Sequence, residues 1–171
     1  IDSHGYPDFL GASLSAVSAV ETAVIVISAT DGIQMNTIRL FNAAKERGMA
    51  CIIVINKIDT GTGPLEDLIN SIQESFGMEC RCANLSNRDG TAVLDCVTSN
   101  SGDDAFTDVA EANINIIETI IEADEELMES YLGGEVISPD KLSAAFTEAV
   151  TTRTVIPIVF TSSRNEAGIE E

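Results

Sequence analysis

Basic residues are scarce in this chain of 171 residues: nine lysines and arginines stand against 28 aspartates and glutamates, for a formal net charge of −19. A surface of that sign repels a phosphate backbone instead of neutralising it. The composition therefore argues against direct binding of nucleic acid by this acidic surface. It favours a cation or a basic protein face as partner, or a solubilising role for the charge.

Long hydrophobic runs are missing as well. The longest apolar stretches fall well below the roughly 18 residues that a membrane-spanning helix needs, and nothing in the sequence resembles a signal peptide. We therefore expect no membrane association and a cytoplasmic location. Because the chain opens on Ile1 and not on methionine, we also expect it to be a piece of a longer protein.

Cysteine is sparse, with four residues in the chain. That number is too small for a disulfide framework, so we expect reduced thiols. Cys80 and Cys82 stand two apart, which places both on one face of a strand. They lack a second close pair or a nearby histidine, so ordinary half-buried side chains are favoured over a zinc site.

Hydrophobic residues make up 44% of the chain, and the mean hydropathy is +0.16, which indicates a folded core. Short β-branched runs, typical of strands buried on both faces of a parallel sheet, occur at 24–27, 52–55 and 155–160. Apolar residues at helical spacing occur over 9–20, 36–47 and 65–76. The alternation predicts an α/β fold with a parallel sheet, flanking helices and right-handed crossovers.

The pattern changes in the middle of the chain. Residues 79–85 and 91–98 predict two short strands joined across an Asp-Gly turn. A long helix is predicted over 106–131, and Ser138 caps a further helix that begins with Pro139. The predicted organisation is a core over 1–77, an inserted α+β lobe over 78–151, and a return to the core over 152–171.

Three polar residues end the second predicted strand abruptly: Asn56, Lys57 and Asp59. Ligands of open α/β sheets bind beyond the carboxyl ends of the strands. A carboxylate there can accept hydrogen bonds from two adjacent N–H groups of guanine, an edge that adenine does not offer. The lysine stem can lie on the base, and the asparagine can tie neighbouring loops together. The pattern predicts a guanine site, with a helix cap or a turn as the alternative.

The first nine residues hold a second candidate site. An acidic residue that leaves a strand, here Asp2, can hold Mg²⁺ through water, and the N–H of a glycine, here Gly5, can approach a terminal phosphate. On its own this stretch is more typical of a turn. Because the strand end at 56–59 also carries side chains suited to a nucleotide, a phosphate and Mg²⁺ site is favoured over a simple turn.

Together these stretches resemble the translational GTPases, most closely elongation factor G. The family pattern Asp-Thr-Pro-Gly-His-Pro-Asp-Phe is similar to residues 2–9, and the guanine motif Asn-Lys-x-Asp matches residues 56–59. Ser162 and Ser163 correspond to the later Ser-Ala loop, which contacts the base. The resemblance implies guanine binding by Asn56, Lys57, Asp59, Ser162 and Ser163.

The resemblance covers nearly the whole chain. Residues 29–34 are similar to the loop after the following strand, and residues 123–132 to the long helix of the lobe inserted in elongation factor G. That lobe argues against smaller members such as elongation factor Tu. The resemblance implies a partial P-loop-GTPase-type sheet, GTP or GDP with Mg²⁺ as cofactors, and GTP hydrolysis on the ribosome during translocation. It also implies contact between the lobe and a ribosomal stalk protein.

One departure from the family concerns catalysis. Where the family has Pro-Gly-His, this chain has His4-Gly5-Tyr6, so Tyr6 replaces the histidine that positions the attacking water. A tyrosine can hydrogen-bond, but it does not reproduce the geometry of imidazole or its protonation near neutral pH. Either His4 takes over this role, or it is a loop residue that faces solvent or a partner.

The larger departure is an absence, because the sequence contains no G-x-x-x-x-G-K-[ST]. The backbone cradle and the lysine that hold the β- and γ-phosphates are therefore missing. We expect a fragment of a GTP-binding domain that is inactive by itself and belongs to a parent GTPase. The alternatives are a hydrolysis-impaired GTP-binding paralogue and a stalk-interaction module formed by the lobe.

Overall fold

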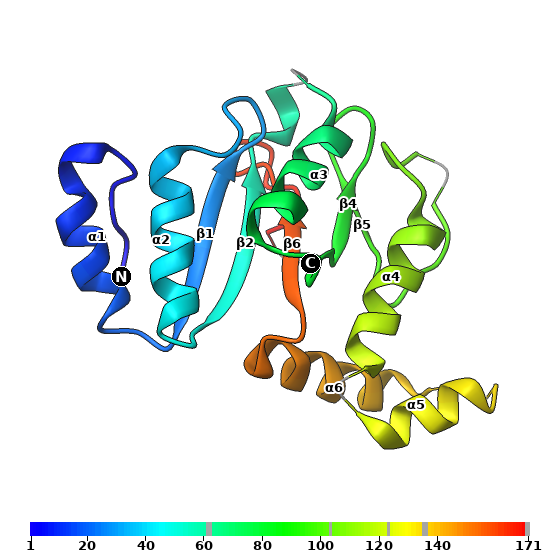
Figure 1. The fold of residues 1–171 in the computed structure, drawn as a ribbon. Helices are drawn as coiled ribbons and strands as arrows, with labels where there is room; N and C mark the ends of the chain where they lie inside the picture. Colours follow the sequence, from blue (N-terminus) through cyan, green and yellow to red (C-terminus); the bar gives the residue numbers. More distant parts are fainter. Residues whose placement is uncertain (61–62, 103, 123, 135–136, 170–171) are drawn as a thin grey trace.

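A four-stranded parallel sheet forms the centre of the computed structural model, which describes residues 1–60, 63–102, 104–122, 124–134 and 137–169 (Figure 1). The strands, in their spatial order, are β1 (Thr22–Ser28), β2 (Ala50–Asn56), β6 (Ile156–Phe160) and β3 (Cys80–Cys82). All three neighbouring pairs are parallel. The predicted α/β class with a parallel sheet is therefore confirmed.

Helices pack against this sheet and build its main core. The segments of this part of the chain are η1 (Pro7–Phe9), α1 (Leu10–Val17), α2 (Met35–Glu46), η2 (Ile58–Thr60) and α3 (Leu65–Phe76). Phe41 of α2 and Phe76 of α3 stack with their ring centroids 4.2 Å apart, over buried strand residues such as Ile53. Gly77 ends α3 at a φ of 126°, a conformation that glycine adopts without steric strain.

One face of β1 differs from the expectation of burial on both sides. Its burial alternates: Ala23, Ile25 and Ile27 face the core, whereas Val24 and Val26 are 56% and 60% exposed. Within the part of the chain that the structure describes, β1 pairs with β2 alone, so its other edge carries no partner strand. The apolar run was correctly predicted as a strand, but half of its side chains are not covered.

The predicted strand over 79–85 divides between two sheets. Cys80–Cys82 pairs in parallel with β6 of the main sheet, although it lies inside the stretch assigned to the lobe. Only β4 (Asn84–Ser86) forms the predicted hairpin, antiparallel to β5 (Val93–Asp95). Asn84 explains why the chain leaves β6 here, because its side chain takes the place of main-chain bonds between the strands. Its Oδ1 accepts from the N–H of Phe160 at 2.6 Å, and its Nδ2 donates to the carbonyl of Phe160 at 3.3 Å.

The single long helix expected over 106–131 is wrong, because two helices occupy this stretch. They are α4 (Val109–Ile121) and α5 (Glu125–Leu132), and α6 (Pro139–Thr152) follows with Ser138 as its cap, as predicted. The carboxylate of Asp124 accepts from the N–H groups of Glu126 and Leu127, so it caps a new helix. Apolar periodicity continued across this cap, which hid the break.

The three helices α4, α5 and α6 share a second core, on the side of the sheet away from α1 (Figure 1). Its buried members are Ile116, Ile120, Ile121, Leu127, Ala145, Ala149 and Val155. The stretch assigned to the lobe divides between the two cores, because Leu85, Cys96, Ala105 and Val109 belong to the main core. None of the helices in the described residues is both long and apolar enough to cross a membrane.

The Asn84 bridge yields a stability prediction. We expect Asn84→Ala to lower the free energy of unfolding of this chain by about 1–3 kcal/mol, because the N–H and carbonyl of Phe160 lose their partners in a buried setting. Urea unfolding measures the difference. Asn70→Ala, at an exposed amide on α3, is the control and should change it by less than about 0.5 kcal/mol. An equal effect of the two substitutions would contradict the bridge.

Buried thiols give a second prediction. Burial, reinforced by the carboxylates of Glu79 and Asp95 respectively, raises the pKa of Cys80 and of Cys96 to about 12. At pH 8 both thiols are then protonated in the folded chain, and the thiol form is a poor nucleophile. We expect iodoacetamide to alkylate them far more slowly in the folded chain than in urea, as followed by mass spectrometry. Equal rates in both states would refute the assignment.

Candidate functional site

Polar loops follow β1, β2 and β6 at the same edge of the main sheet. The strands are in register at this edge, where Ser28 is paired with Asn56 and Ile55 with Phe160. Their carboxyl ends therefore deliver three loops to one place, which is where open parallel sheets bind ligands. The loops cover residues 28–34, 56–60 and 161–168.

Asn56 joins all three loops. Its side-chain Oδ1 accepts hydrogen bonds from the N–H of Lys57 at 2.8 Å and from the N–H and hydroxyl of Ser163 at 3.1 and 3.2 Å. Its main-chain carbonyl accepts from the N–H of Ala29 at 2.8 Å. One residue at the end of β2 thus fixes the loop after β6 through its side chain and the loop after β1 through its backbone.

Asp59 is oriented by the loop after β6. Its Oδ1 accepts from the hydroxyl of Ser162 at 2.6 Å, and that hydroxyl accepts in turn from the N–H of Asn165 at 3.2 Å. Ser162 is fully buried, whereas Asp59 is half-buried. Within the described residues Oδ2 of Asp59 has no hydrogen-bond partner, so this carboxylate is held in place with acceptor capacity to spare.

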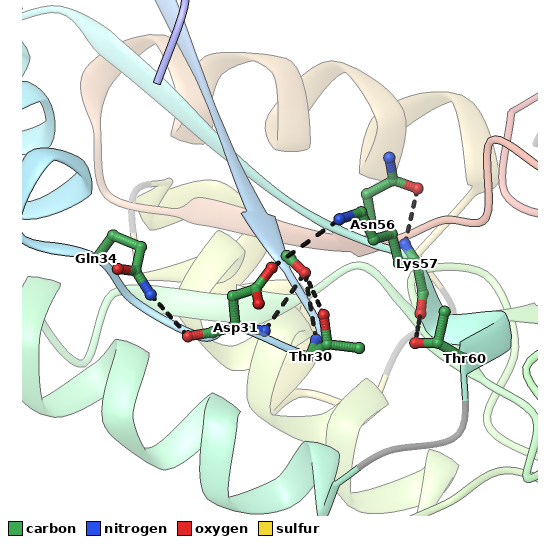
Figure 2. A network of polar contacts seen from close by, with 7 residues as sticks. Thr30, Asp31, Gln34, Asn56, Lys57 and Thr60 are labelled. Atoms are coloured by element: carbon green, nitrogen blue, oxygen red, sulfur yellow. Dashed lines mark hydrogen bonds and ion pairs between the residues drawn. The ribbon is translucent and has the colours of Figure 1, made fainter. Parts of the chain in front are cut away.

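Lys57 has a constrained backbone. Its φ of 68° lies in the left-handed region, which is uncommon for a residue other than glycine and often marks functional sites. Its carbonyl accepts from the N–H and hydroxyl of Thr60 at 3.1 and 2.7 Å. Figure 2 shows its side chain reaching toward Asp31, whose Oδ2 lies 3.9 Å from the Lys57 ammonium.

The first residues lie beside β1 and are held by two side chains. The amide of Asn36 donates to the carbonyl of Gly5 at 3.1 Å, and the hydroxyl of Ser13 donates to the carbonyl of His4 at 3.2 Å. This segment lines a cavity of about 500 Å³ together with the loop after β1, and the lining includes Asp2, Gly5 and Asp31.

Tyr6 does not line this cavity. It is 74% exposed and lines a neighbouring hollow with Met35, which shares Gly5 and Asp31 with the cavity. The imidazole of His4 packs edge-on against Phe9, with their ring centroids 4.9 Å apart. Among the residues that the structure describes, neither ring has a polar contact with Asn56 or Asp59.

The structure thus brings some of the predicted site residues together and leaves others apart. Hydrogen bonds link five of them in two groups, Asn56 with Lys57 and Ser163, and Asp59 with Ser162. Asp2 and Gly5 share a cavity with Asp31 and, in the described part of the chain, form no hydrogen bond with these five. Sequence reasoning assigned no role to Asp31, although an acidic residue followed by glycine at the end of a buried run was a usable signal.

A family model settles the affiliation of this chain. The model, described as the elongation factor Tu GTP binding domain, matches residues 1–171. The chain belongs to this family. The match confirms the resemblance to translational GTPases, and it covers both the core and the predicted lobe.

Known relatives of this GTP-binding domain agree with the match. The chain is 27% identical over 170 residues to the tetracycline resistance protein TetW of Butyrivibrio fibrisolvens, covering 99% of this chain and 24% of that protein. It is 29% identical over 184 aligned positions to an elongation factor G-like protein of Mycobacterium tuberculosis, covering 100% of this chain and 26% of that protein.

A solved structure supports the same fold. A crystal structure of a protein from Thermus thermophilus superposes with a TM-score of 0.81 at 26% identity, over 96% of this chain and 27% of that one. The chain therefore spans about a quarter of the length of the relatives it matches. It corresponds to a fragment of the GTP-binding domain of a translational GTPase.

Proposed function

We propose that this chain is the guanine-reading part of an elongation factor G-like translation factor, which binds and hydrolyses GTP on the ribosome during translocation. The observation that carries the proposal is the Asn56 junction, because it assembles the loops of Lys57, Asp59 and Ser163 at one edge of the sheet. The names of the relatives support the translational role.

The carboxylate of Asp59 is suited to the guanine edge. Each carboxylate oxygen has two acceptor sites, so the Ser162 hydroxyl on Oδ1 leaves room for two N–H groups of the base. Adenine lacks that pair of adjacent donors and would leave a half-buried charge poorly paired. We propose that Asp59 selects guanine, that the Lys57 stem covers the base face, and that Asn56 and Ser163 hold the loops around it.

The cavity beside β1 is suited to the phosphate side of the nucleotide. Asp2 contributes a carboxylate to it, which fits Mg²⁺ held through water, because Mg²⁺ retains several waters and binds few protein ligands. A Cβ built on Gly5 would meet nothing within 4 Å, so this segment is open to an approaching phosphate. Mg²⁺ would neutralise phosphate charge there, while Asn36 fixes the backbone of Gly5.

The exposed side of β1 supports the view that other parts of the GTP-binding domain complete the site. Strands of parallel sheets are normally covered on both faces, yet Val24 and Val26 are open here. Without a phosphate-binding loop, this chain by itself is proposed to be inactive in GTP hydrolysis. The complete protein that contains it is the proposed GTPase.

The principal alternative is a hydrolysis-impaired GTP-binding paralogue. It is favoured by the exposure of Tyr6 and by the packing of His4 on Phe9, because among the described residues no hydrogen bond fixes either ring for orienting water. In that case nucleotide binding through Asp59 would remain, while turnover would be slow.

The lobe is the proposed contact for a ribosomal stalk protein. Acidic side chains lie on α4, at its C-cap and on α5, namely Glu118, Glu122 and Glu129. One ion pair lies nearby, between Glu126 and Lys141 at 3.4 Å. A basic partner face would complement this surface. The side chain of Glu125, the first residue of α5, lies outside the described part of the structure.

Base selectivity tests the role of Asp59. In the complete protein, Asp59→Asn should weaken GDP binding at least ~10-fold, because one charged acceptor is replaced by an amide donor facing donors of the base. The new amide matches the additional carbonyl of xanthine, so binding of xanthosine diphosphate should improve. Calorimetry with both nucleotides measures this exchange.

The control for this test keeps the loop intact. The amide oxygen introduced by Asp59→Asn can still accept from the Ser162 hydroxyl, whereas Ser162→Ala removes that bond and leaves the carboxylate. We expect Ser162→Ala to weaken both nucleotides without changing their ratio. An unchanged GDP to xanthosine diphosphate ratio in Asp59→Asn would exclude Asp59 as the guanine reader.

Ribosome-stimulated GTP hydrolysis tests the role of Tyr6. If Tyr6 impairs catalysis, Tyr6→His in the complete protein should raise the turnover by ~10²-fold or more, the usual scale of acid–base or water-positioning groups. Tyr6→Phe is the matched control, because it removes only the hydroxyl. High turnover in the unsubstituted protein and no gain with histidine would reject the paralogue and support the enzyme.

A further inference from the structure

We propose that Asp31 is a positioning residue for guanine-nucleotide binding: its carboxylate holds the ammonium of Lys57 and so aligns the lysine stem across the base site. The inference rests on the proposed function of Lys57. It adds a residue from the loop after β1 to a site otherwise built from the loops after β2 and β6.

The contact joins the two halves of the candidate site. Lys57 belongs to the group organised by Asn56, whereas Asp31 lines the cavity shared with Asp2 and Gly5. The Lys57 ammonium lies 3.9 Å from Oδ2 of Asp31, and Figure 2 shows the two side chains approaching each other from the ends of β1 and β2. This ion pair is a side-chain link between the two groups, beside the main-chain hydrogen bond from the Ala29 N–H to the Asn56 carbonyl.

Both ends of the lysine are restrained. The backbone of Lys57 is left-handed, and the Lys57 carbonyl accepts two hydrogen bonds from Thr60. The ammonium at the other end of the side chain pairs with the carboxylate of Asp31. The four-carbon stem between these points can then take fewer conformations than a free lysine, whose many rotamers make its ordering on ligand binding costly.

The loop that carries Asp31 is shaped without help from Lys57. The Asp31 N–H donates to the Ser28 hydroxyl at 3.4 Å, and the Asp31 carbonyl accepts from the Gln34 amide at 2.8 Å. The N–H of Gly32 donates to the Ser28 carbonyl at 2.9 Å, and Gly32 has a φ of 65°. The carboxylate is therefore presented by a preformed turn (Figure 2).

Exposure indicates that this pair acts on ligand binding more than on folding. The side chains of Lys57 and Asp31 are 55% and 62% exposed, and exposed ion pairs contribute little to stability. A lysine that is already aligned needs less ordering when a base binds, which improves affinity. The pair also balances the charge of Asp31, which would otherwise repel phosphates from the cavity it lines.

A double-mutant cycle on the complete protein tests the proposal. GDP dissociation constants are measured by calorimetry for the unsubstituted protein, Asp31→Asn, Lys57→Met and the double variant. At about 0.05 M salt, Asp31→Asn should weaken GDP binding roughly two- to fivefold, the scale of an exposed ion pair. In the Lys57→Met background the same change should no longer weaken GDP binding, because Asp31 supports binding through the lysine.

Three controls separate positioning from a general effect of charge. Asp31→Glu retains a carboxylate and should keep the affinity within about twofold. Asp140→Asn, at the start of α6 in the lobe, changes the net charge equally and should leave the affinity unchanged. At about 1 M salt the difference between Asp31→Asn and the unsubstituted protein should shrink toward zero, because salt screens an exposed pair.

The outcomes distinguish this inference from the proposed function. Unchanged GDP affinity in Asp31→Asn at low salt, or an equal loss in both backgrounds, overturns the positioning role while guanine binding stands. Absence of GDP binding by the unsubstituted protein overturns both. Circular dichroism of Asp31→Asn should match that of the unsubstituted protein; if that variant unfolds, comparison of Asp31→Glu with Asp31→Ser decides between positioning and folding.

Discussion

The acceptance of hydrogen bonds by the Asn56 side chain is the constraint on which the rest of the site depends. A single amide oxygen binds the N–H of Lys57 and of Ser163, and the main chain of the same residue binds Ala29. This junction ties the three loops together, and the Ser162 hydroxyl on Asp59 adds a second bond between the loops after β2 and β6. With these bonds, the carboxylate of Asp59 and the stem of Lys57 are placed by the fold itself, before any ligand arrives.

The core makes this junction possible. Burial of Ile53 and Ile55 on β2 and of Ile158 and Phe160 on β6 fixes the pairing of the two strands, so their ends coincide. A slip of one residue would turn every inward side chain to the opposite face, and such a slip is strongly disfavoured where a core is present. Hydrophobic register thus determines where the polar loops begin.

Sequence reasoning reached most of this arrangement and missed parts with a physical cause. The β-branched runs predicted three of the four strands of the main sheet. The polar residues that end the second run identified Asn56, Lys57 and Asp59 as site residues. The predicted strand over 79–85 contains β3, but its pairing was missed because its partner β6 lies far along the chain. The break between α4 and α5 was hidden because Asp124 caps a helix inside continuous apolar spacing. The pair of Asp31 with Lys57 depends on side-chain reach between two loops, which no spacing rule encodes.

Selectivity between GDP and ADP in the complete protein tests the central claim most directly, because it asks whether the loops joined by Asn56 read a guanine base. Calorimetric titration with each nucleotide under the same salt and Mg²⁺ concentrations gives the ratio of dissociation constants. We expect GDP to bind at least ~100-fold more tightly than ADP, since adenine lacks the donor pair for Asp59. Equal affinities for the two nucleotides would contradict this role of the loops.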